Sequence, residues 1–163
     1  MLETRVLYPL LDERIVRHAL SGPVIVLDAG NCFNPYQIVR QIRSKTPQVE
    51  TVLRRILVAR AFTCFQVVSL LEQTQINFGS IFILQLLTTF ADEMIKINDR
   101  MRLLKQVGAQ IERLRQLVPL TIALNTTRFA GDPVMGWVSR LQTCADQILL
   151  PEYVAESPTP TLF

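Results

Sequence analysis

Short apolar runs alternate along this chain with longer segments of helical periodicity. The runs are VIVL at 24–27, ILVAR at 56–60, SIFILQLL at 80–87 and LTIAL at 120–124. An apolar run without polar alternation is typical of a strand that helices cover on both faces. Strands separated by helix-length segments favour parallel pairing. We therefore expect a three-layer α/β fold, with a mostly parallel sheet of four or five strands flanked by helices.

Helix signals fill the segments between the apolar runs. Pro35 suits the first turn of a helix, and Ser21-Gly22-Pro23 is a stop signal after the first one. The longest recurrence of apolar residues at three- and four-residue steps is typical of a helix packed on a sheet. The predicted helices cover residues 12–20, 36–43, 49–54, 65–76, 92–117 and 137–145, and a short last strand covers 148–150.

The composition indicates one folded domain. The chain has 163 residues, of which 49% are hydrophobic and 19% charged, and this excludes a disordered protein. Such apolarity fits either a surface covered by a partner or a large buried sheet, and both readings stay open. We expect a core over 1–152 and a loose tail over 153–163. Without an apolar stretch of eighteen residues or a signal peptide, an intracellular protein is expected, cytoplasmic or nuclear depending on the organism.

Cysteine and histidine are too few and too scattered to predict a metal site. Cys32, Cys64, Cys144 and the single His18 show no zinc-like spacing, so buried thiols in a reducing compartment are expected. His18 is interpreted as a solvated or half-buried helix residue. The net charge of +3 and the pI of about 9.0 permit nucleic-acid binding without requiring it.

Successive segments of the chain resemble RecA/RadA-type recombinases, over about residues 12–150. VIVLDAGNCFNPYQIVRQI at 24–42 resembles the strand, loop and helix that follow the family's phosphate-binding helix. ILVARAFTCFQVVSLLEQ at 56–73 is the closest match, because Ala-Arg-Ala-Phe leads into an amphipathic helix as in the RadA branch. SIFILQLL and VPLTIALNTT fall where the family has its magnesium-side strand and its next core strand. The resemblance implies a RecA-like core.

The groups that the family uses for ATP chemistry are replaced. The chain has no G-x-x-x-x-G-K-[ST] motif, which would cradle phosphates with backbone amides and a lysine. By the resemblance, Gly30 stands at the catalytic acid, Gln85 at the magnesium-side aspartate and Thr126 at the polar sensor. An upstream loop lost from a fragment would not explain Gly30 or Gln85. We therefore expect no enzymatic activity, no catalytic residues and no cofactor.

Asp28, at the end of VIVLD, has two interpretations. A carboxylate after an apolar strand mimics the magnesium-side acid of nucleotide-binding proteins. Alternatively, Asp28 stabilises its turn by accepting backbone N–H bonds from Gly30 or Asn31. The second interpretation is favoured here.

In RecA-like proteins the loops after the third and fourth core strands bind single-stranded DNA, and their counterparts are about 88–98 and 126–140. Arginine beside aromatic residues suits backbone contact and base stacking. Two alternatives remain open: Phe129 and Trp137 pack against the end of the sheet, and the basic side of the long helix is a solvated face. The candidate DNA-binding residues are Lys96, Arg100, Arg128, Phe129, Trp137 and Arg140.

The predicted function is that of a non-catalytic RecA-like accessory protein of recombinational DNA repair. It would bind a RecA-like partner as a hetero-oligomer, with single-stranded DNA as an optional second partner and no membrane. One alternative is an interaction scaffold that reuses the fold without DNA. The other is a nucleotide-binding protein with an atypical phosphate site, which would use Asp28 and Asp146.

Overall fold

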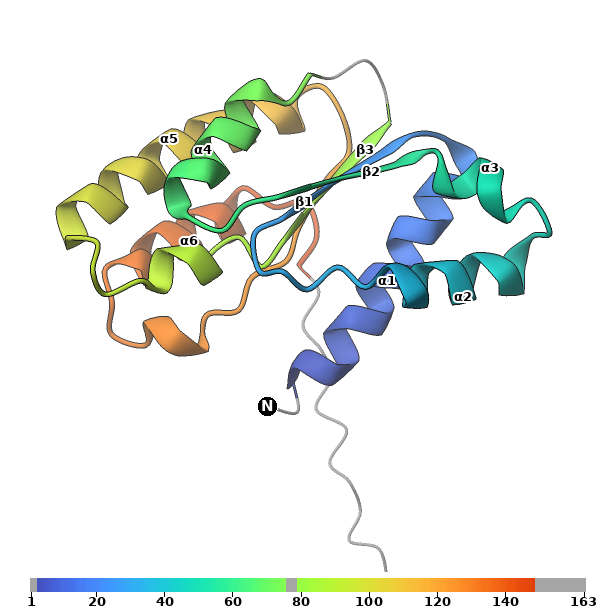
Figure 1. The fold of residues 1–163 in the computed structure, drawn as a ribbon. Helices are drawn as coiled ribbons and strands as arrows, with labels where there is room; N and C mark the ends of the chain where they lie inside the picture. Colours follow the sequence, from blue (N-terminus) through green and yellow to red (C-terminus); the bar gives the residue numbers. More distant parts are fainter. Residues whose placement is uncertain (1–2, 76–78, 149–163) are drawn as a thin grey trace, which may run out of the picture.

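The computed structural model describes residues 3–75 and 79–148, with side chains described from residue 8 onward. Helices and strands alternate along the chain (Figure 1). The order is α1 (Glu3–Ser21), β1 (Val24–Asp28), α2 (Pro35–Lys45), α3 (Val49–Leu53), β2 (Ile56–Arg60), α4 (Cys64–Gln73), β3 (Ser80–Leu84), η1 (Thr88–Ala91), α5 (Ile97–Arg115), β4 (Leu120–Ile122), η2 (Thr127–Phe129) and α6 (Val134–Thr143).

The sheet has the strand order β2-β1-β3-β4, and its three pairings are all parallel. Val24 at the start of β1 is in register with Ile56 on one side and with Ser80 on the other. The predicted α/β class and parallel sheet are therefore confirmed, with four strands in the described part of the chain. Of the predicted strand at 148–150, Ile148 is described without regular structure. Residues 149–150 and the predicted tail at 153–163 lie outside the described residues.

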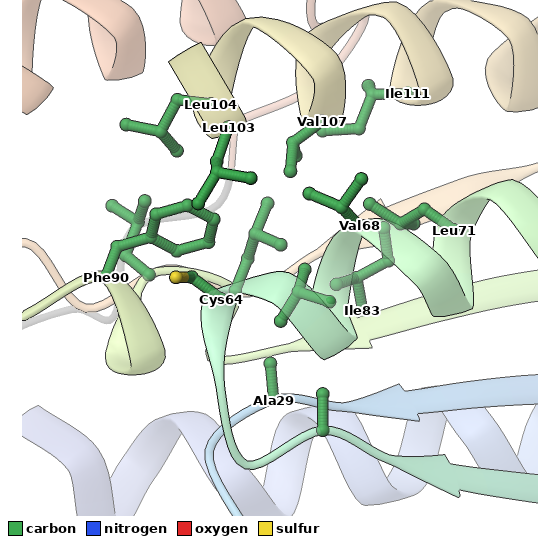
Figure 2. Close-up of a cluster of buried hydrophobic side chains, with 14 of the residues drawn as sticks. Ala29, Cys64, Val68, Leu71, Ile83, Phe90, Leu103, Leu104, Val107 and Ile111 are labelled. Atoms are coloured by element: carbon green, nitrogen blue, oxygen red, sulfur yellow. The ribbon is translucent and has the colours of Figure 1, made fainter. Parts of the chain in front are cut away.

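Helices cover both faces of the sheet. The helices α1, α2 and α3 lie against one face, and α4, α5 and α6 lie on the other (Figure 1). Along β1, Val24 and Val26 pack toward α1–α3, whereas Leu27 and then Ala29 pack toward the opposite layer. Figure 2 shows the larger core, in which Phe90 and Cys64 lie beneath the α5 side chains. No helix in the described ranges is both long and apolar enough to span a bilayer.

Local signals explain the starts of α2 and α4. Asn34 Oδ1 accepts the backbone N–H groups of Tyr36 and Gln37, and Pro35 fills the first turn of α2 as predicted. Thr63 caps α4 in the same way, through the Gln66 N–H. These short-range bonds occur within four residues, so a single sequence is enough to predict them.

Several boundaries differ from the prediction, and the structure explains three of them. Helix α1 starts at Glu3, nine residues earlier than expected, and continues through Pro9. Strand β3 ends at Leu84 because Gln85 adopts φ 53°, which turns the chain out of the sheet. Helix α5 starts at Ile97 instead of residue 92, because Asp92 stabilises a separate turn by accepting the Met94 N–H.

Strand β2 forms an edge of the sheet. No other strand in the described part of the chain pairs with its outer side. Leu57 is 60% exposed, and Val58 is also exposed. The run ILVAR reads like the central strands in sequence, but its position leaves apolar side chains on the surface.

Candidate functional site

A hollow lies at the carboxyl edge of the sheet, where the crossover direction changes. The chain leaves β1 toward β2 on one side, whereas it leaves β3 toward β4 on the other. Such switch points are where open α/β sheets place their ligands. The hollow has a volume of about 500 Å³. Its walls come from the loops after all four strands, and they include Gly30, Asn31, Phe62, Thr63, Phe65, Thr88, Asp92 and Arg128.

Asp28 lies next to this edge but is fully buried by its own turn. Its Oδ1 accepts the Cys32 N–H at 3.0 Å, and its Oδ2 accepts the Phe33 N–H at 3.0 Å. Oδ2 also accepts the Nε–H of Arg60 at 3.3 Å. The turn-stabilising interpretation is therefore supported, but with donors one to three residues further along than predicted. The shift follows from Asn31, whose φ of 50° reverses the chain before the two donating amides.

A thiol and a phenol lie close to the Asp28 carboxylate. The Cys32 Sγ is 3.5 Å from Asp28 Oδ1. Burial, reinforced by the negative charge of Asp28, raises the pKa of Cys32 to about 12. Burial also raises the pKa of Tyr8 to about 12. Both groups stay protonated at neutral pH, so Cys32 does not have the thiolate character of a nucleophilic cysteine.

The three cysteines are expected to react with a thiol reagent at very different rates. At pH 8 a pKa of about 12 leaves only about 10⁻⁴ of Cys32 as thiolate. Cys144 is exposed, whereas Cys64 is buried. Timed labelling with iodoacetamide, followed by mass spectrometry of the peptides, should modify Cys144 first and Cys64 only after unfolding. Rapid labelling of Cys32 in the folded protein would contradict the proposed protonated state.

Gly30 faces Gln85 across the ends of β1 and β3. A Cβ added at Gly30 would lie 2.4 Å from the Gln85 Cβ and 2.9 Å from its Cγ. An acid at position 30 therefore requires Gln85 to move. Gln85 itself is buried, and its Nε2 has no hydrogen-bond partner among the described residues. In the described ranges, no three histidine, cysteine, aspartate or glutamate side chains gather closely enough to hold a metal ion.

The six candidate DNA-binding residues divide into surface and structural positions. Arg128 is exposed at the rim of the hollow, and Lys96 and Arg140 are also exposed. Phe129 is buried in the larger core, and Trp137 is half-buried against it. As placed, Phe129 cannot stack on a base, because the turn η2 packs its ring against the core. The open alternative, in which these two rings pack the sheet end, agrees with the structure.

Arg100 also has a structural role. It donates to Asp132 Oδ2 at 3.2 Å and to the Phe90 carbonyl at 3.3 Å, and its side chain is largely buried. The pair ties the start of α5 to the loop before α6. Its guanidinium is thus engaged within the protein, which leaves Lys96, Arg128 and Arg140 as the exposed cations of the predicted set.

Two functional candidates were missed in the sequence. Phe62 and Phe65 line the hollow and are 68% and 53% exposed. The signal for Phe65 was present, because Cys64, Val67, Val68 and Leu71 form the buried stripe of α4 and Phe65 falls outside it. Phe62 is the second residue after β2, in a turn whose direction the sequence does not reveal.

No family model matches the sequence, and no curated protein matches it.

Proposed function

We propose that this chain is a non-catalytic RecA-like accessory protein of recombinational DNA repair, which binds a RecA-like recombinase through the edge of β2. The observation that carries the proposal is the apolar outer side of that strand, which pairs with no other strand in the described part of the chain. Single-stranded DNA is proposed as a second ligand, held at the carboxyl edge of the sheet.

The backbone of β2 offers hydrogen-bonding groups outward. The Arg55 carbonyl accepts the Val24 N–H, and the Ala61 N–H donates to the Asp28 carbonyl. Odd-numbered residues therefore bond to β1, and the alternation of a strand directs the N–H and C=O of Val58 away from the sheet. Edge strands that must stay single usually carry charges or proline. Here the charge of Arg60, at the end of β2, is paired with Asp28. The middle of the edge is therefore uncharged and able to accept another strand.

The positions that would carry ATP chemistry support a binding role. Gly30 has no side chain, Gln85 is neutral, and the Asp28 carboxylate is occupied by two amides and an arginine. Transfer of a phosphoryl group depends on positioned charges that neutralise the phosphate oxygens. Gly30, Gln85 and Asp28 supply no such charge at the positions that match the family's ATP-binding groups.

The hollow favours one alternative, a nucleotide-binding protein with an atypical phosphate site. Its volume of about 500 Å³ lies within the range of small-ligand pockets, and it opens at the switch point of the sheet. Titration calorimetry with ATP and magnesium tests this alternative. Micromolar binding would favour it over the non-catalytic accessory role.

Charge placed on the edge of β2 should disrupt the proposed complex. Leu57→Lys introduces a cation on a side chain that is 60% exposed, so folding should be unaffected. If β2 is the contact, desolvating this lysine should weaken binding by about tenfold or more. The measurement is biolayer interferometry against the RecA-type recombinase of the native host.

Leu117→Lys is the matched control, because Leu117 is 61% exposed and lies after α5, outside the β2 edge. It should bind like the parent protein. Equal affinity of both variants would exclude the β2 edge as the contact, and no complex at micromolar concentrations would exclude the recombinase partner.

A further inference from the structure

We infer that the hollow holds one unstacked nucleotide of a single-stranded nucleic acid, with Phe62 and Phe65 as its stacking surface and Arg128 as its phosphate contact. This inference rests on the nucleic-acid part of the proposed function and is independent of the β2 partner surface. It assigns the stacking role to two rings that line the hollow, instead of to Phe129 and Trp137, which pack against the core.

The two rings are exposed and held by a fixed turn. Phe62 is 68% exposed and Phe65 is 53% exposed, and both line the hollow. The Phe62 N–H donates to Gln66 Oε1 at 2.8 Å, while the Gln66 N–H donates to Thr63 Oγ1 at 3.2 Å. This reciprocal pair resembles a capping box and fixes the direction in which the chain enters α4. A fixed turn reduces the entropy cost of presenting aromatic faces to a ligand.

Arg128 places positive charge across the hollow from the two rings, because it follows β4 whereas the rings follow β2, at the opposite edge of the sheet. Arg128 is exposed at the hollow, and in the described ranges no carboxylate lies within ion-pair distance of its guanidinium. The amino-terminal end of α4, a helix of ten residues, opens beside Phe62 and Thr63 and favours an anion. Planar apolar surface next to a free cation matches a nucleobase joined to a phosphate.

Asp92 narrows the choice of ligand. Its side chain lines the same hollow, and its Oδ1 accepts the Met94 N–H at 2.9 Å. A carboxylate here repels a ligand with several free phosphate charges, such as a nucleoside triphosphate, more than it repels one phosphodiester. The hollow is also open to solvent and built from four loops, so a nucleic-acid strand can enter and leave it. These features favour a nucleotide within a strand over a free nucleotide.

Fluorescence anisotropy with a labelled oligothymidylate at low salt tests the stacking surface. The double variant Phe62→Ala, Phe65→Ala should bind at least about tenfold more weakly, since each lost base–aromatic stack costs about that factor. Tyr36→Ala is the matched control, because Tyr36 is 85% exposed but does not line the hollow. It should bind like the parent protein. An abasic oligomer with the same number of phosphates should not distinguish the phenylalanine variant from the parent.

The salt dependence tests Arg128. Arg128→Gln should reduce the slope of log affinity against log salt by about 0.7, the value for one phosphate of a single strand. Arg43→Gln, an exposed arginine at the end of α2, should leave the slope unchanged.

The outcomes separate the inference from the proposed function. If the parent binds the oligomer and the phenylalanine variant binds equally well, the inference is wrong while DNA binding stands. If the parent binds no oligomer at low salt, this inference and the proposed DNA binding are both wrong. Only the proposed partner surface on β2 then remains. If thymidine 5′-phosphate competes as well as the strand does per nucleotide, the ligand is a free nucleotide and the strand assignment is overturned.

Discussion

Asp28→Ala is expected to lower the free energy of unfolding by at least about 3 kcal/mol, because hydrogen bonds to a charged group are each worth about 1.5–3 kcal/mol. The carboxylate is fully buried and accepts the N–H groups of Cys32 and Phe33, both at 3.0 Å. Alanine leaves these amides without partners. It also removes the acceptor for Arg60, whose exposed position allows water to replace part of that contact.

A graded series separates the bonds from the shape of the side chain. Asp28→Asn keeps one carbonyl oxygen, so it should satisfy one amide and destabilise the protein less than alanine does. Arg60→Gln should have a smaller effect than either change, because Arg60 is partly solvated. Urea unfolding followed by circular dichroism measures all three. An alanine variant as stable as the parent would show that the turn does not depend on Asp28.

Some element boundaries could be predicted because their signals are local. Strand β2 occupies residues 56–60 as expected, and Pro35 starts α2. The early start of α1 could not be predicted, because Pro9 reads as a helix breaker. The exposure of β2 could not be predicted either. Strand order depends on the side to which each crossover turns, and apolar runs carry no information about that side.

The arrangement of the candidate site depends more than the element boundaries do on contacts between residues that are distant in sequence. Arg100 reads as a free cation in the sequence, but it pairs with Asp132, thirty-two positions away. Phe129 and Phe62 are equally aromatic, yet the fold buries the first and exposes the second. Asp28 was the exception, because its two amide partners lie four and five residues further along the chain. Contacts within one turn can be predicted from the sequence. Contacts between strands can be predicted only when the register of the sheet is known.

The opposition of Gly30 and Gln85 is such a cross-sheet contact, and Gly30→Ala should destabilise the protein by about 1–3 kcal/mol through overpacking. The added Cβ would lie 2.4 Å from the Gln85 Cβ, an atom next to the backbone that cannot rotate away. Gly22→Ala is the matched control. Gly22 has no atom within 4 Å of the added Cβ and no positive φ, so that variant should be as stable as the parent or slightly more stable.

Gln85→Gly should rescue the Gly30→Ala variant. It removes the clashing Cβ, and glycine adopts the φ of 53° at position 85 without strain. The double variant should therefore be less destabilised than the sum of the single variants, with a coupling energy of about 0.5–3 kcal/mol in a urea-unfolding double-mutant cycle. Additive effects would show that the two positions do not exclude each other. Strong coupling would show that a side chain at position 30 and a side chain at position 85 exclude each other in this fold.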